Sequence, residues 1–271
     1  MHNPTQQTHV LDRGSETANV DDRQIKAQYQ LQTCLAECGL HSPHGLRVLE
    51  FGFRNGLFLR ACRDAGLHPT GLEIEKQYYD RVSRGHPDLD LILYDGLNVP
   101  LPDESCDLIV SFQVLEHVAS LATTLDECVR LLKPGGIMYH VLPNYRSFYE
   151  GHYRVLWWPF LNRAAGRVWL KILRKHTPYY ETLNIVKPAD VRRAMHKHRR
   201  TIEIISLGRK EFLDRFSAEQ IAKVQQKHLR TLLTALLRLG PLKSPLIKTI
   251  AACDLYYPIT LIVRKTPHPQ N

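Results

Sequence analysis

The residues best suited to chemistry in the first half of the chain are carboxylates and glycines placed where apolar segments end. Residues 47–51, RVLEF, have the apolar run of a buried strand ending around Glu50, and Gly52 and Gly56 follow it. Residues 57–65 then take helical spacing. A strand, a glycine turn and a helix together form a geometry that can hold a phosphate or a nucleoside.

A second carboxylate follows the next predicted strand. Residues 69–74 resemble a short strand that ends on Glu73, 17 residues after Gly56. A carboxylate in this position can accept hydrogen bonds from both ribose hydroxyls of a bound nucleoside. This reading fits NAD and S-adenosylmethionine alike.

Three familiar motifs are absent. Arg54 and Leu57 occupy the second and third glycine positions of a G-x-G-x-x-G dinucleotide fingerprint, and no Gly-Lys-Ser/Thr of a P-loop follows. The chain also has no G-x-S-x-G nucleophile elbow. A dehydrogenase and a hydrolase are therefore disfavoured, and the pattern that remains is E-x-G-x-x-x-G.

The elements that must position these residues alternate between strands and helices. Helices are predicted over residues 23–39, 57–65, 77–83 and 121–132, one or two more over 215–239, and strands over 47–51, 69–74, 89–93, 107–112, 137–144, 202–207 and 257–265. Such alternation predicts a parallel sheet with helices on both faces, and ligands then lie at the carboxyl ends of the strands.

Four motifs in order carry a family resemblance: VLEFGFRNG, GLEIE, Asp95-Gly96 with PLPDESCDLIVSFQVLEHV, and LLKPGG. Over residues 47–143 the chain resembles the class I S-adenosylmethionine-dependent methyltransferases of the type 11 kind. The resemblance implies a Rossmann-like, doubly wound α/β sheet of seven strands, and S-adenosylmethionine as cofactor. It also implies a helical basic insertion after the fifth strand and a further helical insertion before the last.

The same resemblance assigns the cofactor residues. It implies that Glu50 and the backbone around Gly52 and Gly56 hold the methionine portion, that Glu73 holds the ribose and that Asp95 accepts the adenine amine. The complete set implied for the cofactor is Glu50, Gly52, Arg54, Gly56, Glu73, Ile74, Asp95, Gly96, Phe112 and Gln113.

Arg54 departs from the family pattern, which has a glycine at this position. Arginine adds bulk and charge where a glycine lets the backbone approach a ligand closely. Three readings stay open: Arg54 points outward, it pairs with the cofactor carboxylate, or it blocks the site.

Catalytic candidates lie at two places. His117, preceded by Glu116, follows the predicted fourth strand and is either a general base for a hydroxyl or a residue that shapes the pocket. Glu150, His152 and Tyr153 follow the fifth strand, in a segment that resembles one in methyltransferases of bacterial surface-glycan assembly. We predict His152 as base, with Glu150 or Tyr153 orienting it or the acceptor, and a structural histidine as the alternative.

No metal site is expected. Cys34 and Cys38 share a predicted helix face, but no Cys-x-x-Cys or matching histidine pair accompanies them. The six cysteines are interpreted as reduced core residues.

Charge is distributed unevenly along the chain. Residues 1–143 hold 12 basic and 19 acidic side chains, residues 144–200 hold 13 and 3, and residues 201–271 hold 11 and 5. The acidic first half is suited to binding a cationic sulfonium. The basic insertion is suited to an anionic substrate, a nucleic acid or an anionic membrane surface, and the alternative is that it is only a solvated basic face. Within the insertion, basic residues at helical spacing from Arg163 to Arg174 oppose an apolar face, which predicts a lid or a peripheral membrane contact.

The predicted organisation is a disordered tail (1–22), a cofactor-binding core (23–143), a basic aromatic-rich lid (144–200), the rest of the sheet with its helical insertion (201–265) and a tail (266–271). No segment approaches the roughly 20 apolar residues of a membrane span, and the first residues lack the apolar core of a signal peptide. We expect a cytoplasmic protein, with contact at the inner face of the membrane left open.

The leading functional hypothesis is methyl transfer from S-adenosylmethionine to a small-molecule or glycan acceptor, such as a lipid-linked or surface polysaccharide precursor, as O-methylation. One alternative is an RNA methyltransferase, although the sequence offers no recognisable RNA-binding module. Another is a non-catalytic binding protein that keeps the fold. The oligomeric state is left open.

Overall fold

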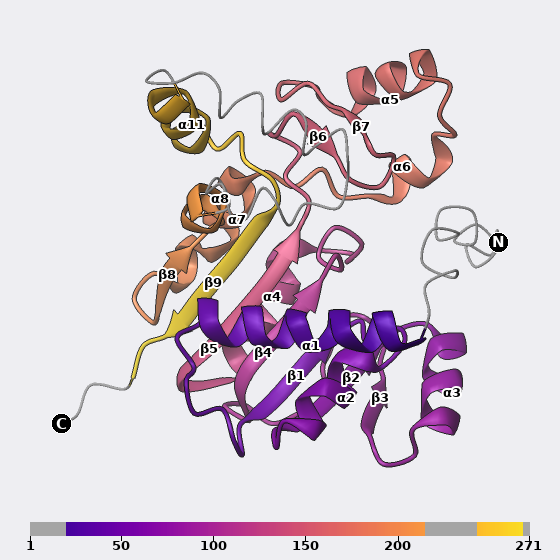
Figure 1. Ribbon diagram of the computed structural model, residues 1–271, viewed down its shortest axis with the longest axis vertical. Coiled ribbons are helices and arrows are strands. Elements are labelled where there is room, and N and C mark those ends of the chain that lie inside the picture. The colour runs from indigo at the N-terminus through magenta and orange to yellow at the C-terminus, as the bar shows by residue number, and fades with distance from the viewer. Residues whose placement is uncertain (1–19, 215–242, 268–271) are drawn as a thin grey trace.

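Seven strands form one sheet in the computed structural model, which describes residues 20–214 and 243–267 (Figure 1). The strand order is β3-β2-β1-β4-β5-β9-β8. The strands are β1 Arg47–Phe51, β2 His68–Glu73, β3 Asp90–Leu93, β4 Cys106–Phe112, β5 Leu132–Leu142, β8 Ile202–Ser206 and β9 Ile259–Lys265. Strands β1 to β5 are mutually parallel, whereas β9 runs antiparallel to both of its neighbours, β5 and β8. The predicted seven-stranded α/β fold is confirmed, and the all-parallel expectation is corrected at β9.

Helices cover both faces of the sheet. The helices of the described residues are α1 Val20–Glu37, α2 Leu57–Asp64, α3 Lys76–Gly85, α4 Leu121–Leu131, α5 Arg163–Ile172, α6 Pro178–Thr182, α7 Pro188–Met195, the 3-10 helix η3 His196–His198, α8 Arg209–Asp214 and α11 Lys243–Ala252, of which α5 and α6 lie beyond the strand ends. Successive residues of a strand point to opposite faces, so Leu108 packs with the α1 and α2 side chains while Ile109 packs with those of α4 and α7. The sheet is therefore buried on both sides along its central strands.

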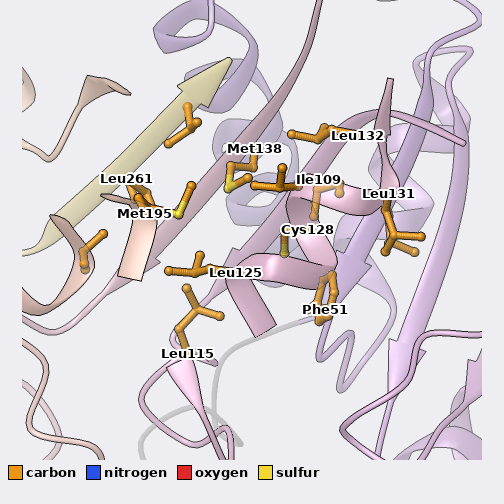
Figure 2. Packing of buried hydrophobic residues seen from close by; sticks show 14 of the residues in the cluster. Phe51, Ile109, Leu115, Leu125, Cys128, Leu131, Leu132, Met138, Met195 and Leu261 are labelled. Carbon is orange, nitrogen blue, oxygen red and sulfur yellow. The ribbon is translucent and has the colours of Figure 1, made fainter. Parts of the chain in front are cut away.

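The core between the sheet, α4 and α7 is built from aliphatic and sulfur-containing side chains together with the ring of Phe51 (Figure 2). Leu125 and Cys128 of α4 meet Ile109 and Met138 from the sheet, and Met195 of α7 reaches the same cluster. Fully burying a side chain of this size contributes roughly 1.5–3 kcal/mol. This core fixes the strand ends that carry the site.

Two boundaries differ from the sequence prediction. Helix α1 begins at Val20, three residues before its predicted start, and residues 1–19 lie outside the described part. Strand β5 begins at Leu132 rather than residue 137, because the pairing shifts register between Cys106 and Leu108 and takes up the Lys-Pro-Gly-Gly segment. The predicted helix over residues 215–239 lies outside the described residues.

The insertion after β5 lies over the carboxyl end of that strand (Figure 1). It contains a two-stranded hairpin, β6 Tyr149–Glu150 with β7 Val155–Leu156, that the sequence analysis did not predict. The hairpin and helices α5 and α6 share a small aromatic core of their own, made by Tyr145, Tyr153, Trp157, Leu170, Tyr180 and Leu183. Val191 and Met195 instead pack into the main core. The part of the insertion up to α6 is thus a separate layer, whereas α7 packs into the main core.

The cysteines are all free, and five of the six are buried, with only Cys253 exposed. Burial is the main cause that raises the pKa of the Cys34 thiol well above its ordinary value. The interpretation as core residues is confirmed for five of the six cysteines and is wrong for Cys253. Among the described residues, no helix is long and apolar enough to cross a membrane.

Gly71 of β2 provides a test of this packing. A Cβ there would lie 2.5 Å from atoms of both Leu59 and Phe53. We expect Gly71→Ala to lower the free energy of unfolding by about 1–3 kcal/mol, the usual cost of overpacking a core. The matched control is Gly85→Ala at the end of α3, where a Cβ meets nothing within 4 Å. Urea unfolding of both variants measures the difference, and equal stability would contradict the packing described here.

Candidate active site

The loop after β1 is shaped by its two glycines. Gly52 has a φ of 70°, and a Cβ there would lie 2.7 Å from Cγ2 of Val114. Gly56 has a φ of 72° at the start of α2, where a Cβ would lie 2.6 Å from Val82. Left-handed backbone and close contact together require glycine. The loop is therefore held against the segment that follows β4.

Glu50 lies at the end of β1 with only 5% of its surface exposed. Its Oε2 atom has no hydrogen-bond partner among the described residues. Burial, and then the nearby Glu73, raises the pKa of this carboxyl well above its ordinary value. Buried polar atoms are normally paired, so Glu50 offers an unfilled acceptor at the position where the resemblance implies the methionine portion.

Glu73 ends β2 and organises the neighbouring backbone. Its Oε2 accepts a hydrogen bond from the N–H of Arg54 (3.2 Å), and its Oε1 accepts from those of Ile74 (2.9 Å) and Glu75 (3.1 Å). Burial raises the pKa of the carboxyl, and the three amides oppose that rise. Two carboxylate oxygens have about four lone-pair positions, so Glu73 can hold this loop and still accept a ribose hydroxyl.

Asp95 is exposed and closes a turn after β3. Its Oδ1 accepts hydrogen bonds from the N–H groups of Leu97 and Asn98, both at 2.8 Å, and these bonds lower the pKa of the carboxyl, that from Asn98 most. The side chain of Ile74 is 55% exposed, and its Cγ2 lies 3.5 Å from the position of a Cβ on Gly96. An exposed aliphatic side chain beside a turn with a carboxylate offers an adenine both an apolar face and a hydrogen-bond acceptor.

Arg54 is exposed and lies at the rim of the site. Its guanidinium carbon is 5.7 Å from the centre of the Tyr78 ring, within the range of a cation–π contact. Of the three interpretations of Arg54, the one in which its side chain points outward matches this contact with Tyr78. The Arg54 charge is also one of the lesser causes that lower the pKa of His117, after burial. The loop after β1, residues 52–56, which is called the cofactor loop below, and His117 are therefore neighbours.

Phe112 and Gln113 end β4 in different ways. The Phe112 ring packs 5.0 Å from that of Phe58 and 6.1 Å from that of Tyr139, centre to centre, so the ring belongs to the core on the α1 and α2 face. Gln113 has a φ of 57° and an exposed side chain, and its N–H donates to the carbonyl of Val141. Of these two predicted cofactor residues, Gln113 is the one whose side chain is exposed at the strand ends.

The two groups of predicted catalytic residues meet in space. Glu116 and His117 follow β4, while Glu150 and His152 belong to the β6–β7 hairpin; these four residues are called the glutamate–histidine cluster below. Nδ1 of His152 is 2.9 Å from Oε1 of Glu150, and its Nε2 is 3.6 Å from Oε1 of Glu116. The rings of His117 and His152 lie edge to face with centres 5.7 Å apart.

Tyr153 and two tyrosines that the sequence analysis missed support the cluster. The backbone N–H of Tyr153 donates to Oε2 of Glu150 (2.6 Å), and its hydroxyl donates to the carbonyl of His176. The Tyr145 hydroxyl donates to Oε1 of Glu150, and Tyr179 has its hydroxyl 3.5 Å from Nε2 of His117. Their only signal in the sequence is the aromatic richness of the insertion. Tyr153 thus positions Glu150 through its backbone.

The two histidines have opposite pKa shifts. Burial is the largest cause at both rings and disfavours their charged forms. At His117 it prevails and lowers the pKa, whereas at His152 the carboxylates of Glu116 and Glu150 outweigh it and raise the pKa to about 9. An imidazole with that pKa is largely protonated at pH 7, so His152 can act as the predicted base only after its own proton has left.

Comparison with known proteins finds a similar domain and similar chains. Residues 49–140 match the family model described as "Methyltransferase domain". A Mycolicibacterium smegmatis protein with the name "Probable S-adenosylmethionine-dependent methyltransferase" is 33% identical over 111 residues, which are 41% of this chain and 43% of the relative. The "Ubiquinone biosynthesis O-methyltransferase" of Maricaulis maris is 33% identical over 100 residues, 35% of this chain and 39% of the relative.

The fold has a solved counterpart. The crystal structure of an S-adenosylmethionine-dependent methyltransferase from Mesorhizobium loti superposes with a TM-score of 0.56 at 18% identity, covering 88% of this chain and 98% of that one. The chain spans less than half the length of the two curated relatives described above. Its domain match, sheet order and glycine loop agree with one another. Residues 49–140 are therefore similar to a methyltransferase domain, and the chain has the fold of a solved S-adenosylmethionine-dependent methyltransferase.

Proposed function

We propose that the chain transfers a methyl group from S-adenosylmethionine to an oxygen of an acceptor held at the glutamate–histidine cluster. The observation that carries this proposal is the position of the cluster: it joins the segment after β4, which packs on the cofactor loop, to the hairpin over the strand ends. When bound, the cofactor supplies an activated methyl on a cationic sulfur. The unpartnered Glu50 oxygen and the Glu73 carboxylate fit its ammonium and ribose groups.

The chain's own contribution is to position the acceptor and to remove its proton. In-line displacement requires the acceptor oxygen to be held close to the methyl carbon, and orientation of this kind supplies a large part of the acceleration. A hydroxyl must also lose its proton. Two carboxylates and two imidazoles next to the cofactor loop are suited to both tasks.

The acceptor class is proposed to be a small molecule or a glycan precursor carried on a lipid. The support is the similarity to methyltransferases of surface-glycan assembly in the Glu150-Gly-His-Tyr segment and the surface of the insertion described below. The test incubates the full chain with labelled S-adenosylmethionine and, in separate arms, nucleotide sugars, lipid extract and RNA. Label in the sugar or lipid arm is expected. Label only in RNA would favour the RNA methyltransferase alternative, and cofactor binding without any transfer would favour the non-catalytic one.

Cofactor binding by Glu73 and Asp95 can be measured without an acceptor. We expect Glu73→Ala and Asp95→Ala each to weaken binding of S-adenosylhomocysteine by about 1–3 kcal/mol, the scale of a charge-assisted hydrogen bond, or roughly 5- to 150-fold. Calorimetry measures the change, with Asp64→Ala on the exposed face of α2 as the control. Unchanged affinity in both variants would place the nucleoside elsewhere.

The insertion also has a surface that fits an anionic membrane. Its exposed apolar side chains include Leu156, Trp158, Phe160, Val168 and Ile172, and its exposed basic side chains include Arg154, Lys171, Arg174 and Lys175. Phe160 is 79% exposed and Ile172 is 65% exposed. Apolar side chains flanked by lysine and arginine favour the interface of a bilayer with anionic lipids. Peripheral contact here would bring a lipid-linked acceptor to the site.

Vesicle binding tests this surface. We expect the chain to bind phosphatidylglycerol-containing vesicles more tightly than pure phosphatidylcholine vesicles, and Phe160→Ser with Ile172→Ser to weaken binding at least about tenfold, since burying each side chain contributes roughly 1.5–3 kcal/mol. Ile25→Ser, at an exposed position of α1, is the control. Equal sedimentation of the double variant and the parent would refute the contact.

A further inference from the structure

Glu116 is the most unusual charged residue of the site. Its side chain is fully buried, and neither carboxyl oxygen has a hydrogen-bond partner among the described residues. Its ion-pair contacts are with Nε2 of His152 at 3.6 Å and Nε2 of His117 at 4.0 Å, both measured to Oε1. A buried carboxylate is costly unless it is paired or coordinates a metal. A protonated His152 ring would be one such partner, and a metal ion between Glu116 and the two rings would be another.

The three residues present suitable donor atoms at suitable separations. One ligand atom each from Glu116, His117 and His152 lies within 4.8 Å of the others. Bonds of about 2.0–2.2 Å from nitrogen and oxygen to a shared ion place neighbouring ligands roughly 3–3.5 Å apart. The two shorter separations, 3.6 and 4.0 Å, need to contract only slightly to reach that range.

A second carboxylate orients one of the rings. Glu150 accepts the hydrogen bond from Nδ1 of His152, which leaves Nε2 directed at Glu116. Glu150 is itself held by the Tyr145 hydroxyl and the Tyr153 amide. A metal-bound histidine almost always donates its other N–H to such a group. This support distinguishes the cluster from a chance meeting of charged side chains.

We propose that Glu116, His117 and His152 bind a divalent transition metal ion of the zinc or manganese class. Two imidazoles and one carboxylate favour these ions over magnesium and calcium, which prefer oxygen ligands. Three protein ligands leave coordination positions for a further ligand, and the His117 side chain, 35% exposed, lies on the accessible side.

The metal site deepens the proposed function and rests on it for the acceptor. A hydroxyl oxygen of the acceptor occupies an open position, where the ion lowers its pKa and its proton leaves to solvent water. The oxygen lone pair then forms the C–O bond to the methyl carbon. The C–S bond breaks, and its electron pair stays on sulfur, which becomes a neutral thioether.

The test measures ion binding by the full chain after treatment with a chelator and dialysis. Calorimetric titrations with Zn²⁺, Mn²⁺ and Mg²⁺ are expected to show one Zn²⁺ or Mn²⁺ per chain and at least a hundredfold weaker binding of Mg²⁺. Glu116→Gln and His152→Ala should each abolish the tight site. Glu150→Gln should weaken it roughly 10- to 100-fold, the usual effect of losing a supporting partner.

Two controls keep the result interpretable. Asp126 of α4, which pairs with Lys197 and His198, forms a carboxylate–histidine contact outside the cluster, so Asp126→Asn should leave ion binding unchanged. His117→Gln alters a partly exposed ligand and tests the site if Glu116→Gln fails to fold, as circular dichroism would show. Absence of a tight site in the parent chain, or unchanged binding in Glu116→Gln, His117→Gln and His152→Ala, would overturn the proposal.

Failure of this inference is distinguishable from failure of the proposed function. Methyl transfer that persists undiminished in excess chelator would refute the metal site and leave the proposed methyl transfer in place. Tight ion binding without transfer to any acceptor would support the metal site and argue against the proposed methyl transfer.

Discussion

Replacing His152 by alanine is expected to lower turnover roughly 10²–10⁴-fold, the range seen when a positioned group that assists proton transfer is lost. The dissociation constant for S-adenosylhomocysteine should stay within about twofold. The physical reason is that His152 lies in the hairpin over the strand ends, where it contacts the carboxylates of Glu116 and Glu150. The predicted cofactor residues lie instead at the ends of β1, β2 and β4 and on the segments that follow β1, β2 and β3. The measurement is the rate of label transfer to the acceptor found by the screen, alongside calorimetry.

The control for this variant is His68→Ala. His68 is exposed at the first residue of β2, at the opposite edge of the sheet from the strand ends that carry the site. Its rate should match that of the parent chain. A His152→Ala rate equal to that of the parent would remove the residue from the reaction and leave it a structural role in the hairpin.

The second large effect is on stability at acid pH. His140 lies in β5 with no exposed surface, its Nδ1 is 2.8 Å from Oγ of Ser111, and its Nε2 has no partner among the described residues. Burial lowers the pKa of the ring to about 3. The side chains that the strand register places beside it, Ser111 and Leu261, are uncharged.

The direction in which stability changes with pH follows from whether the folded or the unfolded chain binds the proton. Below pH 6.5 the unfolded chain protonates this histidine and the folded chain does not, so stability falls as the pH decreases from about 6.5 toward 3. The expected loss from this group is about 2 kcal/mol between pH 7 and pH 5, at 1.36 kcal/mol per pKa unit. Between pH 7 and pH 5, we expect the free energy of unfolding of His140→Asn to fall by about 2 kcal/mol less than that of the parent chain.

Urea unfolding at pH 7 and pH 5 measures this difference. His68→Asn, at an exposed position, should follow the parent chain. Identical pH dependence in the parent and His140→Asn would show that the ring is able to charge in the folded state.

The elements of the cofactor domain were predictable because their signals are local. Apolar runs that end at Gly52 or at Glu73 define strands, and the structure places β1 and β2 within one or two residues of the prediction. The orientation of β9 was not predictable in this way. Strands buried on both faces show the same apolar run whether their neighbours are parallel or antiparallel, and residues 259–263 are all buried.

The cluster shows where sequence reasoning stopped. His117 and His152 were recognised separately, and a metal was not expected because the ligand spacings that indicate one in a sequence are short. Glu116 was noted only as the neighbour of His117. Its full burial, which makes it the centre of the proposed metal site, depends on packing against the hairpin and on the contact of its backbone carbonyl with the N–H of Asn184.

The sequence alone determined the order of strands and helices up to β5, the glycine loop and the two carboxylates at the ends of β1 and β2, because each depends on residues close together in the chain. Tertiary structure decided which distant side chains share one site. Packing of the β6–β7 hairpin over the ends of β4 and β5 brings Glu150 and His152 to Glu116 and His117. The charges that result there depend on burial and on partners from other segments, which a linear pattern does not contain.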